Sequence, residues 1–253
     1  MYKKILIIFI TLIMCIFFVG CEKEKKTEKI KVHLSVAASL KDPFLKIEQL
    51  YEKEHKNVDL ILNFGSSGAL KQQIVQGAPC DVFISASTNY MDELKNDGYL
   101  LDDTYNEFTK NELVLVSKTN TINSIEDLKN DKYKKIGIGD LNTVPVGQYA
   151  DEVLKNKDIK KDLEDKFVYA KDAMEVLAWT LSSNVDAGFL YSSDISKYKD
   201  VNIYKIDSEL HSPIIYPIGV IKDSKQLEET IKIKKFLLSD DAKKILKDYG
   251  YTF

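Results

Sequence analysis

The sequence predicts an α/β protein built as two lobes with a ligand cleft between them. Short apolar runs alternate with helical segments along the chain, as in sheets assembled from strand–helix–strand units. These units fall into two groups, followed by a return of the chain. Four short turns each end a predicted strand and begin a predicted helix, and ligands of such sheets bind at that end of the strands.

The first 20 residues are predicted to be a lipoprotein signal peptide rather than part of the fold. Lys3 and Lys4 precede an apolar run over 5–19, which is shorter than the roughly 20 residues of a membrane-spanning helix. The stretch from Phe18 to Cys21 resembles the lipobox of bacterial lipoproteins, in which the cysteine is lipidated and becomes the new N-terminus. The alternative is an uncleaved N-terminal anchor. Both interpretations place the rest of the chain outside the cytoplasmic membrane.

Residues 21–30 are predicted to be the lipidated cysteine and a tether, because the segment is highly charged and poor in apolar residues. The first lobe is expected to comprise 31–111 together with 214–253, and the second lobe 112–213. Each is expected to hold a mostly parallel sheet flanked by helices. The predicted strands, each a short apolar run, are Val32–Val36, Val58–Leu62, Val82–Ile84, Leu113–Val116, Ile136–Gly139, Phe167–Tyr169, Ala187–Tyr191, Val201–Ile206 and Ile214–Val220.

The predicted helices carry local start and stop signals. Pro43 and Pro145 fall in first turns, where proline is tolerated or favoured, and Ser124 is expected to cap a short helix. Gly77 and Gly98 follow the ends of two others. The predicted helices are Leu40–Lys53, Gly68–Gln76, Thr88–Asn96, Ser124–Asn130, Val146–Lys155, Ala173–Leu181, Gln226–Leu238 and Asp240–Tyr249.

Composition limits the chemistry of any site. The chain has no arginine, so an anion must be bound without the bidentate guanidinium fork. A formal net charge of −3 argues against a nucleic-acid binder, which usually has a basic excess. Cleavage of the signal peptide removes Cys15 and lipidation blocks Cys21, so Cys80 is the only free cysteine of the mature chain, which excludes an internal disulfide and a cysteine metal site. The scattered His33, His55 and His211 have no metal-ligand spacing, so no direct metal site and no cofactor are expected.

The four turns predict an anion site made of neutral donors. A helix start offers backbone N–H groups without intrahelical partners and a partial positive charge. Two of the turns add serine hydroxyls, and none places a charge where the first helical turn would meet a ligand. The turns are Ala37–Leu40, Gly65–Gly68, Val144–Gly147 and Asp172–Met174.

Five stretches of the chain resemble the molybdate-binding proteins of bacterial molybdate ABC transporters, in the same order and at similar spacing. The stretches are Val36–Leu40, Phe64–Gly68, Gln76–Ala86, Gly139–Ala150 and Gly188–Asp194. The resemblance covers nearly all of the mature chain and implies the type II periplasmic-binding-protein fold, in which a hinge closes two lobes around the ligand. It also implies a monomeric, non-enzymatic lipoprotein on the outer face of the cell membrane. Such a protein would capture molybdate, and tungstate as well, for an ABC permease.

The resemblance further implies which groups hold the oxyanion: two serine hydroxyls, two backbone amides from the second lobe and a tyrosine hydroxyl. Carried over residue by residue, these groups belong to Ser39, Ser67, Val146, Ala173 and Tyr191. Ser66 competes with Ser67 for its role, but its expected role is structural. Asp172 is expected to cap the helix that presents Ala173.

Alternatives remain open from the sequence. One alternative is a relative of the same class that is selective for tungstate or sulfate. A cage of donors rejects a protonated anion such as phosphate. Rejection of sulfate, which is fully ionised, depends instead on the cavity radius. An extracellular hydrolase using Ser67 as its nucleophile is an alternative of another class. Against it, Gly65–Gly68 is no G-x-S-x-G elbow and no histidine lies nearby in the pattern. A surface adhesion or sensory protein of the same fold is a third.

Overall fold

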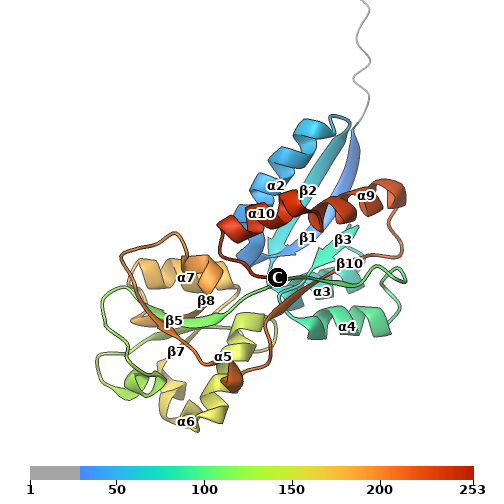
Figure 1. Cartoon of the computed structure of the whole chain (residues 1–253). Coiled ribbons are helices and arrows are strands. Elements are labelled where there is room, and N and C mark those ends of the chain that lie inside the picture. The colour runs from blue at the N-terminus through green and yellow to red at the C-terminus, as the bar shows by residue number, and fades with distance from the viewer. Residues whose placement is uncertain (1–28) are drawn as a thin grey trace, which may run out of the picture.

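The computed structural model describes residues 29–253, which form two α/β lobes (Figure 1). The predicted signal peptide, Cys21 and residues 22–28 of the tether lie outside the described residues. The first strand begins at Ile30, two residues before the predicted start at Val32. No helix between residues 29 and 253 combines the length and apolar character needed to cross a bilayer.

The first lobe contains a five-stranded sheet of order β2-β1-β3-β10-β4. Strand β1 pairs in parallel with both β2 and β3, while β10 is antiparallel to both of its neighbours. The strands are β1 (Ile30–Ala37), β2 (Val58–Gly65), β3 (Val82–Ile84), β4 (Asn106–Lys110) and β10 (Ile215–Val220).

The second lobe contains a five-stranded sheet of order β7-β6-β8-β5-β9. Strand β6 is parallel to β7 and β8, and β5 is antiparallel to β8 and β9. The strands are β5 (Leu113–Ser117), β6 (Ile136–Gly139), β7 (Phe167–Ala170), β8 (Ala187–Tyr191) and β9 (Asn202–Lys205).

The two sheets share one topology, although the sequence carries no evident repeat. In each, three parallel strands are followed by an antiparallel strand that arrives directly from the edge strand of the other lobe: β4 leads into β5, and β9 leads into β10. Both sheets are therefore mixed but mostly parallel, because four strands of each run in one direction and only β10 or β5 runs against them. Parallel neighbours need a crossover connection, whereas β5 and β10 enter their sheets straight from the opposite lobe.

Helices cover both faces of each sheet (Figure 1). In the first lobe, α2 (Lys41–Glu54), α9 (Leu227–Leu237) and α10 (Asp240–Asp248) pack on one face, and α3 (Ser67–Val75) and α4 (Thr88–Asn96) on the other. In the second lobe, α5 (Pro145–Asn156) and α7 (Ala173–Leu181) lie on opposite faces. Alternation along β5 serves both layers, because Leu113 and Leu115 join the α5 core while Val114 and Val116 join the α7 core.

Some short elements were not predicted. Strand β4 was missed because its sequence is largely polar and buries only Phe108 and Thr109. The predicted helix after Ser124 is a 3-10 helix, η2 (Ile125–Lys129), and the Ser124 side chain does not cap it. The other unpredicted elements are η1 (Ala38–Leu40), α6 (Lys160–Leu163), η3 (Glu164–Lys166), α8 (Ser192–Ile195) and η4 (Ser208–Leu210).

Candidate functional site

The four predicted turns meet at one small cavity between the lobes. Its volume is about 10 Å³, roughly the room that one water molecule needs, so a large organic molecule does not fit in it. It is lined by Ala37, Ala38, Ser39, Gly65, Ser66, Ser67, Ala86, Val144, Pro145, Val146, Ala173 and Tyr191. Among these described lining residues there is no charged side chain. All five residues expected to bind the oxyanion therefore lie at the same cavity.

Ser67 begins α3, directly after the carboxyl end of β2. Its side chain is 1% exposed, and its Oγ accepts a hydrogen bond of 2.9 Å from the backbone N–H of Ala86. Ser66 is the N-cap of the same helix, with its Oγ accepting from the Ala69 N–H at 3.4 Å. The structural role expected for Ser66 is thus confirmed, and the Ser67 hydroxyl keeps its proton for another partner.

Ser39 lies in η1 rather than at the start of an α-helix, so the expected simple helix start was wrong at this turn. Its Oγ lies 2.9 Å from the hydroxyl of Tyr216 on β10. Its carbonyl oxygen accepts a 2.8 Å hydrogen bond from the Tyr251 hydroxyl. Two buried tyrosines from the last quarter of the chain therefore fix the position of a residue near its beginning.

Tyr191 ends β8 and is 1% exposed. Its hydroxyl has no hydrogen-bond partner among the described residues, and it is one of two such buried side-chain atoms there. Burial raises the pKa of this hydroxyl well above its usual value, so the group remains a neutral donor. An unsatisfied buried hydroxyl costs about 1–3 kcal/mol, and a ligand in the cavity would recover that cost.

Val146 and Ala173 lie in the first turns of α5 and α7, where backbone N–H groups have no intrahelical partner. Pro145 occupies the first position of α5, as predicted. The carboxylate of Asp172 accepts from the Glu175 N–H at 2.9 Å, which confirms its predicted capping role. Both helices start at the carboxyl ends of parallel strands, so their N-termini point toward the cavity edge of the second sheet.

The lobes are in direct contact beside the cavity. The Gly68 N–H donates to the Thr143 carbonyl oxygen at 3.0 Å, and the Tyr90 hydroxyl donates to the Asn142 carbonyl oxygen at 2.7 Å. The side-chain amide of Gln148 donates to the same Tyr90 hydroxyl at 2.6 Å. These bonds join α3 and α4 of the first lobe to the loop before α5 and to α5 itself. The structure is therefore a closed form.

The arrangement of donors at the cavity is suited to binding an anion. The partner of Ser67 Oγ is a backbone donor, whereas a nucleophilic serine needs a base. No histidine lines the cavity in the described part of the chain. Convergent hydroxyl and amide donors bind an anion through bonds of about 1.5–3 kcal/mol each, strengthened by the helix N-termini.

A buried carboxyl lies next to this site. Asp194 Oδ2 accepts from the Tyr191 N–H at 3.1 Å, while Oδ1 is the second buried side-chain atom without a partner in residues 29–253. Desolvation raises the pKa of Asp194 to about 7, and the nearby charges of Asp172 and Asp42 act in the same direction. Asp42, Asp194 and Lys197 line a second cavity of about 40 Å³, which shares Ser39 with the first.

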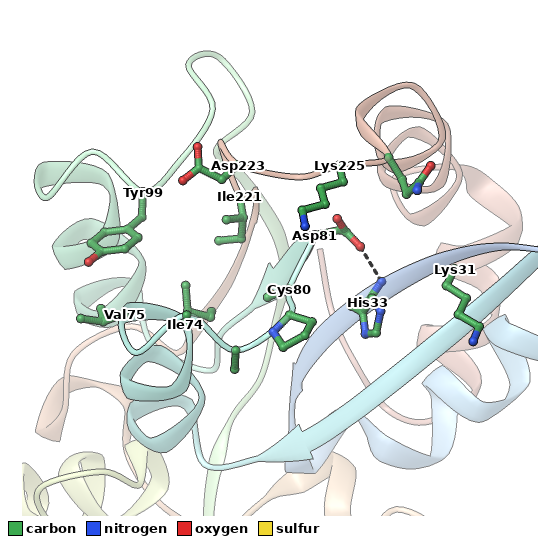
Figure 2. A pocket seen from close by; sticks show the side chains of 14 residues that line it. Lys31, His33, Ile74, Val75, Cys80, Asp81, Tyr99, Ile221, Asp223 and Lys225 are labelled. Carbon is green, nitrogen blue, oxygen red and sulfur yellow. Dashed lines mark hydrogen bonds between the residues drawn. The ribbon is translucent and has the colours of Figure 1, made fainter.

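A further cavity lies elsewhere, at the amino ends of β1 and β3, and has a volume of about 590 Å³ (Figure 2). None of the expected ligand-binding residues lines it. The Asp81 carboxylate there accepts from the His33 N–H at 2.7 Å and from the Ser224 hydroxyl at 2.6 Å. These bonds tie β1 to the segment after β10. Burial raises the pKa of the neighbouring Cys80 thiol to about 11, which keeps it protonated.

Comparison with known proteins assigns the family. The model of the family described as bacterial extracellular solute-binding protein matches residues 32–252. The chain belongs to this family of extracellular solute-binding proteins.

Several relatives are named for molybdate or for ABC transport. The chain is 30% identical to the molybdate-binding protein ModA of Haemophilus influenzae, over 88% of this chain and 90% of that protein. It is 36% identical, over 100% of this chain and 99% of the relative, to YvgL of Bacillus subtilis, provisionally named an ABC transporter substrate-binding lipoprotein. The predicted resemblance to molybdate-binding proteins is confirmed.

Solved structures agree with the fold. A Clostridium difficile structure, provisionally described as the substrate-binding domain of a molybdenum ABC transporter, is 46% identical with a TM-score of 0.67, over 88% of this chain and 98% of that one. The periplasmic molybdate-binding protein of Azotobacter vinelandii has a TM-score of 0.82 at 21% identity, over 88% and 99% of the two chains. The latter likeness supports the fold alone. The predicted two-lobed periplasmic-binding-protein architecture is confirmed.

Sequence reasoning missed the residues that support the site. Tyr216 and Tyr251 contact Ser39, and the N–H of Ala86 contacts Ser67. Tyr216 lies within an apolar strand and resembles an ordinary core residue in sequence. Its partner is 177 residues away, so no local signal identified the contact.

Proposed function

We propose that this protein binds molybdate, and tungstate as well, outside the cytoplasmic membrane and delivers it to an ABC importer. One observation carries the proposal: the buried Tyr191 hydroxyl has no partner in the described chain and lines a small uncharged cavity between two lobes. A compact anion there would satisfy this hydroxyl together with those of Ser39 and Ser67. The amides of Val146 and Ala173 would complete the shell from the second lobe.

Neutral donors can hold such a dianion because several charge-assisted hydrogen bonds together offset its dehydration. A donor cage also discriminates by protonation, since a ligand O–H would face donors where it needs an acceptor. Phosphate retains a proton at neutral pH and would be rejected on this ground. The relatives named for molybdate support the choice of ligand, and the similar geometry of tungstate includes it in the proposal.

The site is tested by replacing its hydroxyls. Ser39→Ala and Ser67→Ala should each weaken molybdate binding about tenfold or more, since each removes a hydrogen bond to a charged ligand. Titration calorimetry measures this. Ser66→Ala is the matched control, because it removes a helix cap and should lower stability by about 0.5–2 kcal/mol with little effect on affinity.

Ligand identity is tested by thermal unfolding with each oxyanion added separately. Molybdate or tungstate at 100 times its dissociation constant should stabilise the wild-type fold against unfolding by about 2.7 kcal/mol, whereas phosphate should not. Absence of stabilisation by both metal oxyanions would refute the proposed function, and stabilisation by sulfate alone would favour the sulfate-selective alternative. Release of product from an ester, lost in Ser67→Ala, would favour the hydrolase.

The partners follow from this function. The protein would act as a monomer that docks on a membrane permease after closing around its ligand. Lipid attached at Cys21 would hold it to the outer face of the membrane, with residues 21–30 as the lipidated cysteine and tether. The described fold would then divide into a first lobe of 31–111 and 214–253 and a second lobe of 112–213.

A further inference from the structure

The serine hydroxyls at the cavity are held by groups that restrict the direction of their protons. For Ser67 the restriction is direct. The backbone N–H of Ala86 can only donate, so Ser67 Oγ must accept this 2.9 Å bond. The Ser67 proton is then free to point at the cavity that this residue lines.

For Ser39 the restriction runs through a chain of side chains. Asn111 lies in the crossing segment between β4 and β5, and its Oδ1 accepts from the backbone N–H groups of Glu112 at 3.0 Å and Ser193 at 3.4 Å. These two donors fix the orientation of the amide. Its Nδ2 therefore faces the hydroxyls of Ser193 and Tyr216, to which it donates at 2.8 Å and 3.4 Å.

The Asn111 amide in turn orients the hydroxyl proton of Tyr216. Its hydroxyl is fully buried and has two hydrogen-bonding neighbours among residues 29–253, the Asn111 amide and Ser39 Oγ. The Asn111 amide group offers no acceptor on this side, so the buried Tyr216 proton is satisfied when it points at Ser39 Oγ, 2.9 Å away. Burial raises the pKa of Tyr216 well above its usual value, so the proton is retained.

We propose that Asn111 and Tyr216 are positioning residues that make Ser39 an obligatory donor to the bound oxyanion. The Ala86 N–H acts on Ser67 in the same way, so both serine hydroxyls are held as hydrogen-bond donors toward the cavity. This inference rests on the proposed function and explains its selectivity. A free serine hydroxyl could rotate to accept a proton from a partly protonated anion, whereas these two cannot without breaking a buried bond.

The test compares two tyrosines that touch the same serine. Tyr216→Phe removes the donor to Ser39 Oγ but keeps the ring, which packs edge-on against Tyr191 and Tyr251 at 5.8 and 5.7 Å. Tyr251→Phe is the matched control, because it removes a buried hydroxyl that donates to the Ser39 carbonyl oxygen instead. The readout is the ratio of dissociation constants for phosphate and molybdate, measured by calorimetry at neutral pH on each full-length protein.

Tyr216→Phe should lower the ratio of the phosphate dissociation constant to the molybdate dissociation constant about tenfold. Molybdate loses a pre-aligned donor, while phosphate gains a hydroxyl that can rotate. Tyr251→Phe should leave the ratio as in the wild type even if both affinities fall. Equal ratios in the two variants would overturn the inference. Failure of the wild-type protein to bind molybdate would instead overturn the proposed function, so the two failures are distinct.

Asn111→Ala provides a second variant, at the first residue of the hydrogen-bonded series Asn111–Tyr216–Ser39. It removes the donor that orients Tyr216, together with the Asn111 bonds to Glu112, Ser192 and Ser193, and does not alter Tyr216 or Ser39 themselves. It should narrow the ratio in the same direction as Tyr216→Phe. An unchanged ratio in a folded Asn111→Ala protein would contradict the proposed chain.

Discussion

At the residue scale, the buried carboxyl of Asp194 makes stability depend on pH. Its pKa is raised to about 7, so between about pH 4 and pH 7 the folded protein holds a proton that the unfolded chain has released. The contribution of Asp194 to stability is therefore greatest at low pH and is lost as the pH rises through this window. Lys197 and Asp42 share its cavity, and Asp172 adds negative charge nearby.

Asp194→Asn should remove this dependence. The amide cannot ionise, and its oxygen can still accept from the Tyr191 N–H. Relative to wild type, the free energy of unfolding of the variant should be higher by on the order of 1–3 kcal/mol at pH 8 and unchanged near pH 4. Urea denaturation at several pH values measures the difference. Asp131→Asn, at an exposed carboxyl, is the control, and an Asp194→Asn protein that follows the wild-type curve throughout would contradict the assignment.

Residue-scale prediction worked where a role depends on nearby sequence. The cap made by Asp172 and the first-turn position of Pro145 follow from local preferences, and the structure has both. The cap expected from Ser124 was wrong, because residue type alone does not fix the side-chain rotamer. The contacts of Asn111 and Tyr216 join residues 105 positions apart, and nothing in either neighbourhood indicates them.

At the element scale, helix α3 approaches the loop before α5 so closely that a side chain would not fit. A Cβ added at Gly68 would lie 2.7 Å from Thr143 Cα and 2.8 Å from the Thr143 carbonyl oxygen. Both atoms belong to the backbone of the opposite lobe. Gly68 is inside a helix, where alanine is the better helix former. The glycine is therefore required by closure rather than by the helix.

Gly68→Ala should separate stability from binding. The free energy of unfolding of the ligand-free protein should stay the same or rise by up to about 1 kcal/mol. The closed form should be destabilised by about 1–3 kcal/mol, because the added methyl group clashes with Thr143. Molybdate affinity should fall about tenfold or more, as measured by calorimetry beside a thermal melt. Gln72→Ala on the exposed face of α3 is the control. Unchanged affinity in Gly68→Ala would show that ligand binding does not need this contact.

Elements with strong local signals were predicted to the residue. Helix α4 (Thr88–Asn96) and strand β8 (Ala187–Tyr191) have the expected bounds, because Gly98 marks the end of the first and an apolar run defines the second. Strand β4 (Asn106–Lys110) has neither signal. It exists through its pairing with β10, more than 100 residues later, and that pairing is a property of the fold.

At the scale of the whole molecule, the proposed anchor predicts where the protein is found. Cys21→Ala should remove the lipid and move the protein from the membrane to the soluble fraction, because each buried CH₂ of an acyl chain contributes about 0.8 kcal/mol to membrane binding. Detergent-phase partitioning and the mass of the N-terminal peptide measure this. Ser212→Ala, in the described fold, is the control. A Cys21→Ala protein that stays bound to the membrane would support the uncleaved anchor instead.

The place of β10 in the first sheet determines the order in which the lobes can be completed. Export presents the chain N-terminus first, yet residues 215–220 must lie between β3 and β4. All five strands of the other sheet fall within 113–205, so that lobe can assemble earlier. Until translocation is nearly finished, β3 and β4 each present an open edge of the kind that recruits neighbouring chains. Truncation before residue 215 would make this transient hazard permanent.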